Sequence, residues 1–245
     1  MRLDRGEGDS LFSEAAIVIP VYNHGSQVGA VIERALEFQM PLVVVDDGST
    51  DQTPQVLARF EGLRIITHPR NLGKGAALIS GLEEAARFAR WAVTIDADGQ
   101  HDPADVVHLF EVLPAGSRPL VVGKREGLTK AAGAPLSSRF GRRFSNFWVA
   151  VSGGPHLTDT QSGFRLYPLP ETINLRPKAR RFNFEVEILV LARRAGLPVL
   201  EIPVRSIYPP KKERVSHFRP WSDFWRNAFT FTRLIASRIL LSIKG

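Results

Sequence analysis

The chain has 245 residues, no cysteine and a formal net charge of +7. The missing cysteines exclude a disulfide framework and thiolate chemistry, and the six scattered histidines show none of the spacings of a zinc site. The basic excess favours an anionic partner such as phosphate, nucleic acid or an anionic membrane surface, although a merely well-solvated surface gives the same charge. No apolar run reaches about 18 residues, so we expect no membrane span within this chain.

Short apolar runs alternate with helical patterns through the first half of the chain. Helices are expected to begin after Asp51 and at Asp102-Pro103, because aspartate caps a helix N-terminus and proline fits its first turn. Repeated alternation of strand and helix predicts an α/β layer with a largely parallel sheet. The expected strands are residues 16–21, 42–45, 63–67, 92–95 and 120–122, and the expected helices are residues 26–38, 53–60 and 76–90.

The second half of the chain is less regular. Its expected elements are a basic helix (137–151), a strand (164–167), a helix that Gly196 ends (183–195) and a strand (199–204). Prolines and charges from Pro209 onward interrupt this pattern. We therefore divide the chain into a tail (1–14), one domain (15–208), and a basic loop followed by an amphipathic helix (209–245).

Three polar clusters follow expected strands, at residues 20–23, 46–51 and 96–100. Ligands of open α/β sheets bind beyond the carboxyl ends of the strands. Each cluster by itself has the composition of an ordinary turn, but three clusters at one sheet edge occupy one place in space. In the third cluster, Asp96, Asp98 and Gln100 offer oxygen atoms of the kind that Mg²⁺ or Mn²⁺ prefers, and such a cation completes its shell with phosphate oxygens.

The turn at residues 70–75 has the sequence Arg-Asn-Leu-Gly-Lys-Gly. A Walker phosphate loop is excluded, because His68 replaces its first glycine and Gly75 replaces the serine or threonine that follows Lys74. A dinucleotide-binding fingerprint is nearer, yet its third glycine is missing. The segment is therefore either a plain strand-to-helix turn or a turn whose amides and Lys74 lie near phosphate or ribose.

Taken in order, these motifs resemble family 2 glycosyltransferases, and the nearest branch is the dolichol-phosphate mannosyltransferase-like, or polyprenyl-phosphate glycosyltransferase, branch. The resemblance covers about residues 15–220 and implies a GT-A fold, which is a Rossmann-like fold of nucleotide-diphospho-sugar transferases with a mixed, largely parallel sheet between helices. It also implies a nucleotide-diphosphate sugar donor, Mg²⁺ or Mn²⁺, and inversion at the anomeric carbon. The motifs are Ile17-Val18-Ile19-Pro20-Val21-Tyr22-Asn23, Val45-Asp46-Asp47-Gly48-Ser49-Thr50-Asp51, Asn71-Leu72-Gly73-Lys74-Gly75, Asp96-Ala97-Asp98-Gly99-Gln100 with its DXD pattern, and Asp159-Thr160-Gln161-Ser162-Gly163-Phe164-Arg165.

The resemblance also implies roles for individual residues. Asp96, Asp98 and Gln100 would hold the metal and the diphosphate, and Lys74 would lie beside the nucleotide. Asp46 is left out, because an aspartate at a strand end can simply brace its turn. The residues expected to bind the donor nucleotide are Pro20, Tyr22, Asn23, Asp47, Lys74 and Asp96.

The acceptor decides which further groups the reaction needs. An inverting transfer to a hydroxyl needs a general base, whereas a lipid phosphate is already anionic and needs cations that hold it near the anomeric carbon. Asp159 is the candidate base for a hydroxyl acceptor. For a phosphate acceptor it would instead orient the acceptor loop or an arginine such as Arg165. The predicted catalytic residues are Asp98, Arg125, Arg139, Asp159 and Arg214, and the other candidate cations are Arg142, Arg143, His217 and Arg219.

Apolar and aromatic residues recur at helical spacing from residue 221 to residue 243. This pattern fits an amphipathic helix at a membrane interface or a helix docked on the domain. A lipid acceptor favours the interface, so we expect a peripheral protein on the cytoplasmic face of the membrane. A membrane protein or a second copy of the chain is a further candidate partner. The residues on the other side of this helix are Asp223, Arg226, Asn227, Arg233, Arg238 and Lys244.

The sequence therefore predicts a metal-dependent, inverting transfer of a sugar from a GDP- or UDP-sugar to a polyprenyl (dolichyl or undecaprenyl) phosphate, with no nucleic-acid partner. Three alternatives stay open. One is the same fold with a hydroxyl acceptor on a glycolipid or saccharide. The second is a dinucleotide-dependent oxidoreductase that uses residues 73–78, which leaves Asp96 and Asp98 unexplained. The third is a non-catalytic nucleotide-sugar sensor, which turnover would distinguish from an enzyme.

Overall fold

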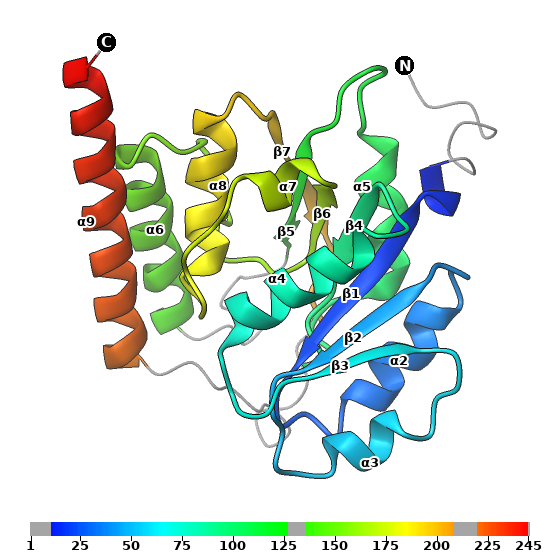
Figure 1. Ribbon diagram of the computed structural model, residues 1–245. Helices are drawn as coiled ribbons and strands as arrows, with labels where there is room; N and C mark the ends of the chain where they lie inside the picture. The colour runs from blue at the N-terminus through cyan, green and yellow to red at the C-terminus, as the bar shows by residue number, and fades with distance from the viewer. Residues whose placement is uncertain (1–10, 127–135, 208–219, 245) are drawn as a thin grey trace.

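A central seven-stranded sheet organises the computed structural model, which describes residues 11–126, 136–207 and 220–244 (Figure 1). Side chains within these ranges are described except at 136–140, 220–224 and 240–244. The strand order is β3-β2-β1-β4-β6-β5-β7, and β6 is antiparallel to both neighbours while the other pairs are parallel. The strands are β1 (Ala15–Val21), β2 (Leu42–Asp46), β3 (Arg64–Thr67), β4 (Trp91–Thr94), β5 (Leu120–Arg125), β6 (Arg165–Pro168) and β7 (Val199–Val204).

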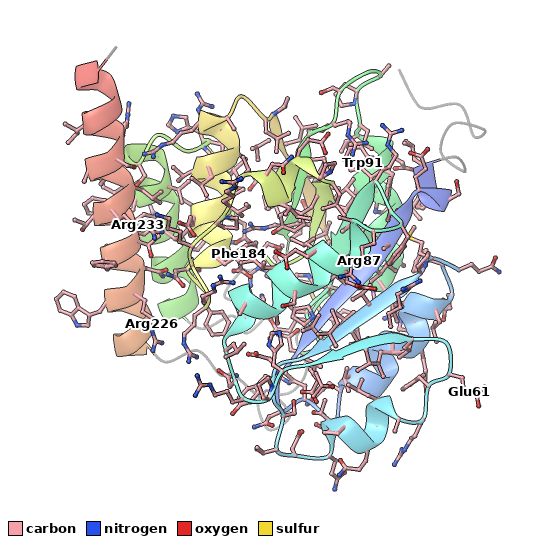
Figure 2. The ribbon with its side chains drawn as sticks, viewed as in Figure 1. Glu61, Arg87, Trp91, Phe184, Arg226 and Arg233 are labelled. Carbon is pink, nitrogen blue, oxygen red and sulfur yellow. The ribbon has the colours of Figure 1, made fainter. Side chains whose placement is uncertain are left out.

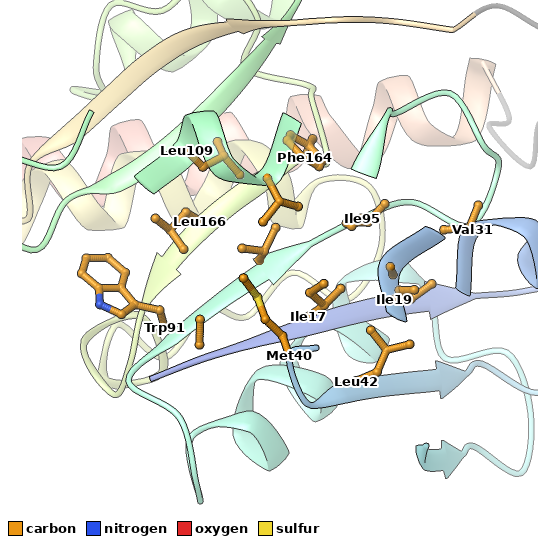
Figure 3. Close-up of a cluster of buried hydrophobic side chains, with 14 of the residues drawn as sticks. Ile17, Ile19, Val31, Met40, Leu42, Trp91, Ile95, Leu109, Phe164 and Leu166 are labelled. Carbon is orange, nitrogen blue, oxygen red and sulfur yellow. The ribbon is translucent and has the colours of Figure 1, made fainter. Parts of the chain in front are cut away.

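Helices cover both faces of the sheet, which explains why the central strands are apolar throughout instead of alternating with polar residues. Ile17 and Ile19 pack with α2 and α5 (Figure 3), whereas Ala16 and Val18 pack with α4 and α8, because successive side chains of a strand point to opposite faces. The helices are α2 (Val28–Leu36), α3 (Thr53–Leu57), α4 (Lys74–Ala85), the 3-10 turn η1 (Pro103–Asp105), α5 (Val106–Glu111), α6 (Leu136–Val151), α7 (Glu171–Asn174), α8 (Phe184–Arg194) and α9 (Pro220–Lys244).

The expected α/β architecture with a mixed, largely parallel sheet is confirmed, and so is the cap at Asp102, whereas the cap position of α3 is Gln52 and not Asp51. The backbone N–H of Ala104 donates to Asp102 at 3.0 Å, where η1 leads into α5. The backbone N–H of Thr53 donates to Asp51 at 2.9 Å, where α3 begins. The two aspartates in the sequence thus predicted the starts of both helices correctly.

The helix α4 begins at Lys74, two residues before the expected start, because a distant loop caps it. Gly73 precedes it with a φ of 107°, and a Cβ there would lie 2.5 Å from the carbonyl oxygen of Arg180. The N–H of Ala76 donates to that same oxygen at 2.8 Å. A partner this far along the chain leaves no local signal, which explains the shifted boundary.

The sheet topology brings the polar clusters to one edge. Strands β1, β2 and β4 are parallel neighbours, so residues 20–23, 46–51 and 96–100 all follow adjacent strand ends. The antiparallel strand β6 begins at Arg165, opposite Thr94 at the end of β4. Residues 159–164, which lead into β6, therefore reach the same edge from the second half of the chain.

The C-terminal helix α9 lies beside α6 and α8 (Figure 1). Phe231 and Leu234 are buried in a small core formed with residues of α6 and α8. Arg233, on the expected polar side, contacts Glu187 of α8 (Figure 2), and Arg238 donates to the carbonyl of Val151 at 2.9 Å. The polar side of the expected amphipathic pattern is therefore the side that docks on the domain.

The apolar side of α9 faces outward. Trp225, Phe229 and Ile239 are 67%, 72% and 55% exposed. The expected docking on the domain is thus confirmed for one face, and the membrane interface stays a prediction for the exposed apolar face. None of the helices formed by the described residues combines the length and the apolar character needed to cross a membrane.

Candidate active site

The first two polar clusters form one hydrogen-bonded pair of loops at the ends of β1 and β2. Asn23, with a left-handed φ of 52°, donates its backbone N–H to the Ser49 hydroxyl at 2.9 Å. Its Oδ1 accepts the N–H of Thr50 at 2.7 Å. Tyr22 and Asn23 are partly exposed, whereas Pro20 is buried inside β1. Of these predicted nucleotide contacts, the structure therefore leaves Tyr22 and Asn23 accessible to a ligand.

Asp47 is buried and shapes the loop that follows β3. Its Oδ1 accepts the N–H of Leu72 at 2.9 Å and its Oδ2 accepts the N–H of Gly73 at 2.7 Å. The Nδ1 of His68 lies 2.7 Å from the same carboxylate. Asp46 accepts the N–H of Ser49 at 2.9 Å and braces its own turn, as expected. The predicted contact between Asp47 and the nucleotide stays a prediction, with this carboxylate already holding the amides of the neighbouring loop.

Lys74 forms an ion pair with Asp96, which the sequence placed in the same site. Its Nζ lies 2.7 Å from Asp96 Oδ1 and 2.5 Å from Glu185 Oε1. Burial alone would lower the pKa of Lys74, but the two carboxylates outweigh burial and raise that pKa above its usual value. Burial would likewise raise the pKa of Asp96, yet Lys74 and His101 hold it below its usual value. Both groups are therefore charged near neutral pH.

Asp98 is the less compensated carboxylate of the pair. It accepts the N–H of Gln100 at 3.0 Å and, within the described residues, it makes no salt bridge. Burial first, and then the negative charge of Asp96, raise the pKa of Asp98 above its usual value. The backbone of Gln100 is held by the N–H of Ile207, which donates to its carbonyl at 2.9 Å. The ring of His101, buried and stacked on Phe164, has its Nε2 3.8 Å from Asp96 Oδ2.

The donor set fits a hard divalent cation. Two carboxylates that repel one another, as the raised pKa of Asp98 records, are stabilised by a cation between them. The described residues contain no group of three histidine, cysteine, aspartate or glutamate side chains that could hold a metal. A cation at Asp96, Asp98 and Gln100 would therefore also depend on water and on phosphate oxygens of a ligand, which is the usual arrangement for Mg²⁺.

Asp159 orients Arg125, not Arg165. The Nε of Arg125 donates to Asp159 Oδ2 at 2.8 Å and its Nη2 donates to Oδ1 at 3.0 Å, which is a bidentate pair. Burial would raise the pKa of Asp159, but its hydrogen bonds and ion pair with Arg125 hold that pKa below its usual value. Arg142 of α6 adds to this effect by its charge. The carboxylate is fully buried, and Glu201 accepts the backbone N–H of Asp159 at 2.8 Å.

Arg165 has a structural role instead. It is fully buried and donates to the carbonyl oxygens of Thr160, Ser162 and Glu185, at distances of 2.9, 2.7 and 2.9 Å. It thereby ties the segment before β6 to the start of α8. The expectation that Asp159 orients an arginine is therefore confirmed, but that arginine is Arg125 of β5, because Arg165 is taken up by backbone carbonyls.

The comparison with known families agrees with this geometry. The family model described as "Glycosyl transferase family 2" matches residues 16–167, which include all three polar clusters and the strand that carries Arg125. The chain belongs to glycosyl transferase family 2. Membership in this family favours glycosyl transfer over the oxidoreductase alternative.

Two relatives of this family 2 glycosyltransferase have informative names. The UDP-N-acetylglucosamine–dolichyl-phosphate N-acetylglucosaminyltransferase of Methanococcus voltae is 29% identical over 213 residues, covering 78% of this chain and 85% of its own. The dolichyl-phosphate beta-glucosyltransferase of Homo sapiens is 28% identical over 225 residues, covering 80% of this chain and 68% of its own. Both names describe glycosyltransferases that act on dolichyl phosphate.

A solved structure supports the fold of this family 2 glycosyltransferase. Mannosyl-3-phosphoglycerate synthase from Rubrobacter xylanophilus has a TM-score of 0.63 and covers 98% of this chain and 78% of its own, at 17% identity. At this identity the likeness shows the fold alone, and it confirms the expected GT-A fold.

Some predicted residues of the family 2 glycosyltransferase cannot be placed at the site. Arg139 lies on α6, but its side chain is outside the described residues. Arg214, with the candidate cations His217 and Arg219, lies outside the described residues altogether. Arg143 is exposed on α6, while Arg142 acts on Asp159. Arg125 and Asp159 are thus the predicted acceptor-side residues that the structure brings together.

Two residues of the site in this family 2 glycosyltransferase, Glu185 and Gly163, were not among the predicted site residues. A Cβ at Gly163 would lie 2.4 Å from Asp96 Oδ2 and 2.7 Å from the Nζ of Lys74, so any larger residue would displace this ion pair. The Thr94 hydroxyl donates to the carbonyl of Gly163 at 2.6 Å and fixes the backbone there. Gly163 belongs to a quoted motif, but no local pattern marks Glu185, which is 111 residues from Lys74.

Proposed function

We propose that the chain transfers a sugar, with inversion and with Mg²⁺ or Mn²⁺, from a GDP- or UDP-sugar to a polyprenyl phosphate. The observation that carries the proposal is the pair of Arg125 and Asp159. A hydroxyl acceptor needs a general base, but both oxygens of Asp159 accept from Arg125, and its lowered pKa makes it a weak base near neutral pH. A phosphate acceptor needs no base and gains from an oriented guanidinium.

The proposed step needs no proton transfer. An oxygen of the acceptor phosphate would attack the anomeric carbon while the bond from that carbon to the donor diphosphate breaks, and the nucleoside diphosphate leaves with the bonding electrons. Arg125 would hold the acceptor phosphate, and Asp159 would fix the plane of its guanidinium. Arg139 and Arg214 remain predicted further contacts to the phosphates.

The donor side would use the loops after β1, β2 and β4. Tyr22 and Asn23 would contact the nucleotide, with Pro20 and Asp47 shaping the loops behind them. Asp96, Asp98 and Gln100 would hold the divalent cation, which supplies positive charge to the departing diphosphate when bound. The Methanococcus voltae relative supports this assignment, because its name combines a UDP-sugar with dolichyl phosphate.

The outward face of α9 supports a peripheral position at the membrane, which we propose to be the cytoplasmic face. Trp225 and Phe229 are exposed aromatic side chains, and Phe147 is exposed on the neighbouring helix α6. Aromatic side chains on an amphipathic helix enter the boundary between headgroups and acyl chains. Such a position would bring the phosphate of a lipid acceptor within reach of the protein.

A donor and acceptor screen tests the proposal. Purified chain is incubated with Mn²⁺ or Mg²⁺, a set of nucleotide sugars, and either polyprenyl phosphate or hydroxyl acceptors, and new lipids are identified by mass spectrometry. We expect a glycosyl phosphate lipid that forms only with metal, and NMR should show an anomeric configuration opposite to that of the donor. Transfer to hydroxyl acceptors alone would contradict the proposed acceptor.

Asp98→Ala tests the metal assignment in the same assay. Because Asp98 is one of the two carboxylates proposed to hold the metal, its removal should lower the transfer rate by at least about 100-fold, while circular dichroism stays unchanged. A folded Asp98→Ala variant with the wild-type rate would reject the assignment of residues 96–100 to the metal.

A further inference from the structure

Three charged side chains from distant parts of the chain meet at the candidate donor site. Lys74 begins α4, Asp96 follows β4, and Glu185 lies in the first turn of α8. The Lys74 ammonium is 2.7 Å from Asp96 and 2.5 Å from Glu185. One ammonium therefore pairs with two carboxylates. Glu185 is only 4% exposed and has no role in the reaction proposed above.

Glu185 is held in place independently of Lys74. Its carbonyl accepts from the buried guanidinium of Arg165 at 2.9 Å. Its place in the first turn of α8 puts the carboxylate near the positive end of the helix dipole. On the other side, the backbone of Gly163 closes over Asp96 and Lys74. The ammonium is therefore confined between its two carboxylates.

The proposed reaction changes the surroundings of Lys74. Asp96 would share its oxygens with a metal that carries the donor diphosphate, so Lys74 would lose part of its pairing with Asp96. A mostly buried ammonium without a carboxylate partner is strongly unfavourable. Glu185 supplies a second partner that does not belong to the predicted metal set.

We propose that Glu185 is a positioning residue that keeps the Lys74 ammonium beside the donor diphosphate when Asp96 engages the metal. This inference rests on the proposed function, because it takes residues 96–100 to be part of the donor site. A role of Glu185 through its charge alone and a role in positioning Lys74 predict opposite effects on diphosphate binding. The diphosphate is an anion, so removing the negative charge of Glu185 by itself would strengthen its binding. Displacement of the Lys74 ammonium from this position would weaken diphosphate binding.

The test measures binding of a nucleoside diphosphate to the full-length chain by titration calorimetry with excess Mn²⁺ and without acceptor. The probe is whichever of UDP, GDP, ADP, CDP and dTDP binds the wild-type chain most tightly. Glu185→Gln should weaken binding roughly tenfold, the effect of one misplaced charge-assisted contact. Glu84→Gln is the matched control, because Glu84 is a mostly buried carboxylate that pairs with Arg64 and Arg87 near the other end of α4. It should change the affinity less than about twofold.

A second background shows whether the effect runs through Lys74. In Lys74→Met, the added Glu185→Gln should not weaken binding further, because no ammonium remains to be positioned. Unchanged or tighter binding by a folded Glu185→Gln variant would overturn the proposal, as would an equal loss in Glu84→Gln or in the Lys74→Met background. If circular dichroism shows that Glu185→Gln does not fold, Glu185→Asp replaces it. This variant keeps the charge but is one methylene shorter, and it should also weaken binding.

The binding test separates this inference from the proposed function, since it involves no sugar and no acceptor. A wild-type chain that binds a nucleoside diphosphate but transfers no sugar would contradict the proposed function, while the variants still decide the role of Glu185. A wild-type chain that binds none of the five diphosphates would overturn both.

Discussion

At the scale of single residues, the site is defined by which charge contacts which. Asp159 has the residue type of a general base, but its position against Arg125 makes it an orienting carboxylate. Asp96 and Asp98 are separated by one residue, yet Lys74 compensates the first, while burial and Asp96 raise the pKa of the second. The pKa and the role of an aspartate therefore depend on its nearest charged neighbour.

Asp159→Asn tests the pair of Asp159 and Arg125. The variant should lose about 2 kcal/mol of unfolding free energy at pH 7, somewhat less than for a fully buried pair because Arg125 is partly exposed. The pKa of folded Asp159 lies below its ordinary 3.8, so the contribution is fully present well above 3.8 and is lost as the pH falls toward the folded pKa. Thermal melts of wild type and variant should therefore converge as the pH is lowered from about 5 to values below 3.8. A stability difference that stays constant over this range would contradict the assignment.

At the scale of elements, one face of helix α9 docks on the domain and the opposite face is exposed and apolar. Phe231 and Leu234 are buried against α6 and α8, and Arg233 is anchored by Glu187. Trp225 and Phe229 point away from the domain and contribute little to its stability. Substitutions on the two faces should therefore affect different properties.

Phe229→Glu tests the outward face. Withdrawing one large aromatic side chain from a membrane interface removes about 1.5–3 kcal/mol of binding, so binding to anionic liposomes in a sedimentation assay should weaken at least tenfold, with no change in melting temperature. Ile65→Glu is the control, because Ile65 is an exposed apolar residue on β3, at the far side of the molecule from α9 (Figure 1). An equal loss in both variants would indicate a general charge effect and would contradict an interface at α9.

At the scale of the whole molecule, α9 is part of the folded domain as well as a proposed membrane contact. Val149, Val186 and Val190 of α6 and α8 lose their apolar cover if the helix is removed. The net charge of +7 adds a long-range attraction to anionic surfaces that does not depend on α9 alone. Deletion of the helix would therefore mix a loss of stability with a loss of membrane binding.

Truncation after residue 219 tests this structural contribution. Phe231 and Leu234 each contribute about 2 kcal/mol by burial, so the melting temperature should fall by at least about 8 °C. Differential scanning calorimetry of the full and truncated chains measures the difference. Melting temperatures within about 2 °C of each other would show that the docked face contributes little.

Patterns of neighbouring residues were enough to predict the strands, two helix starts and the family. Apolar runs predicted the strands, Asp51 and Asp102 predicted two helix starts, and the ordered motifs indicated family 2 glycosyltransferases with the GT-A fold. These signals are local, because burial, capping and turn formation depend on residues a few positions apart.

The pairing of charges that lie far apart in the chain depends on how the strands and helices are arranged in space. The antiparallel strand β6 enters between β4 and β5, so residues 159–164 reach the edge where β1, β2 and β4 end. This insertion brings Asp159 into contact with Arg125 and Gly163 into contact with Asp96. The start of α8 brings Glu185 into contact with Lys74, which is 111 residues away in the sequence. Coulomb interactions depend on distance in space, and strand order, which no local pattern encodes, sets that distance.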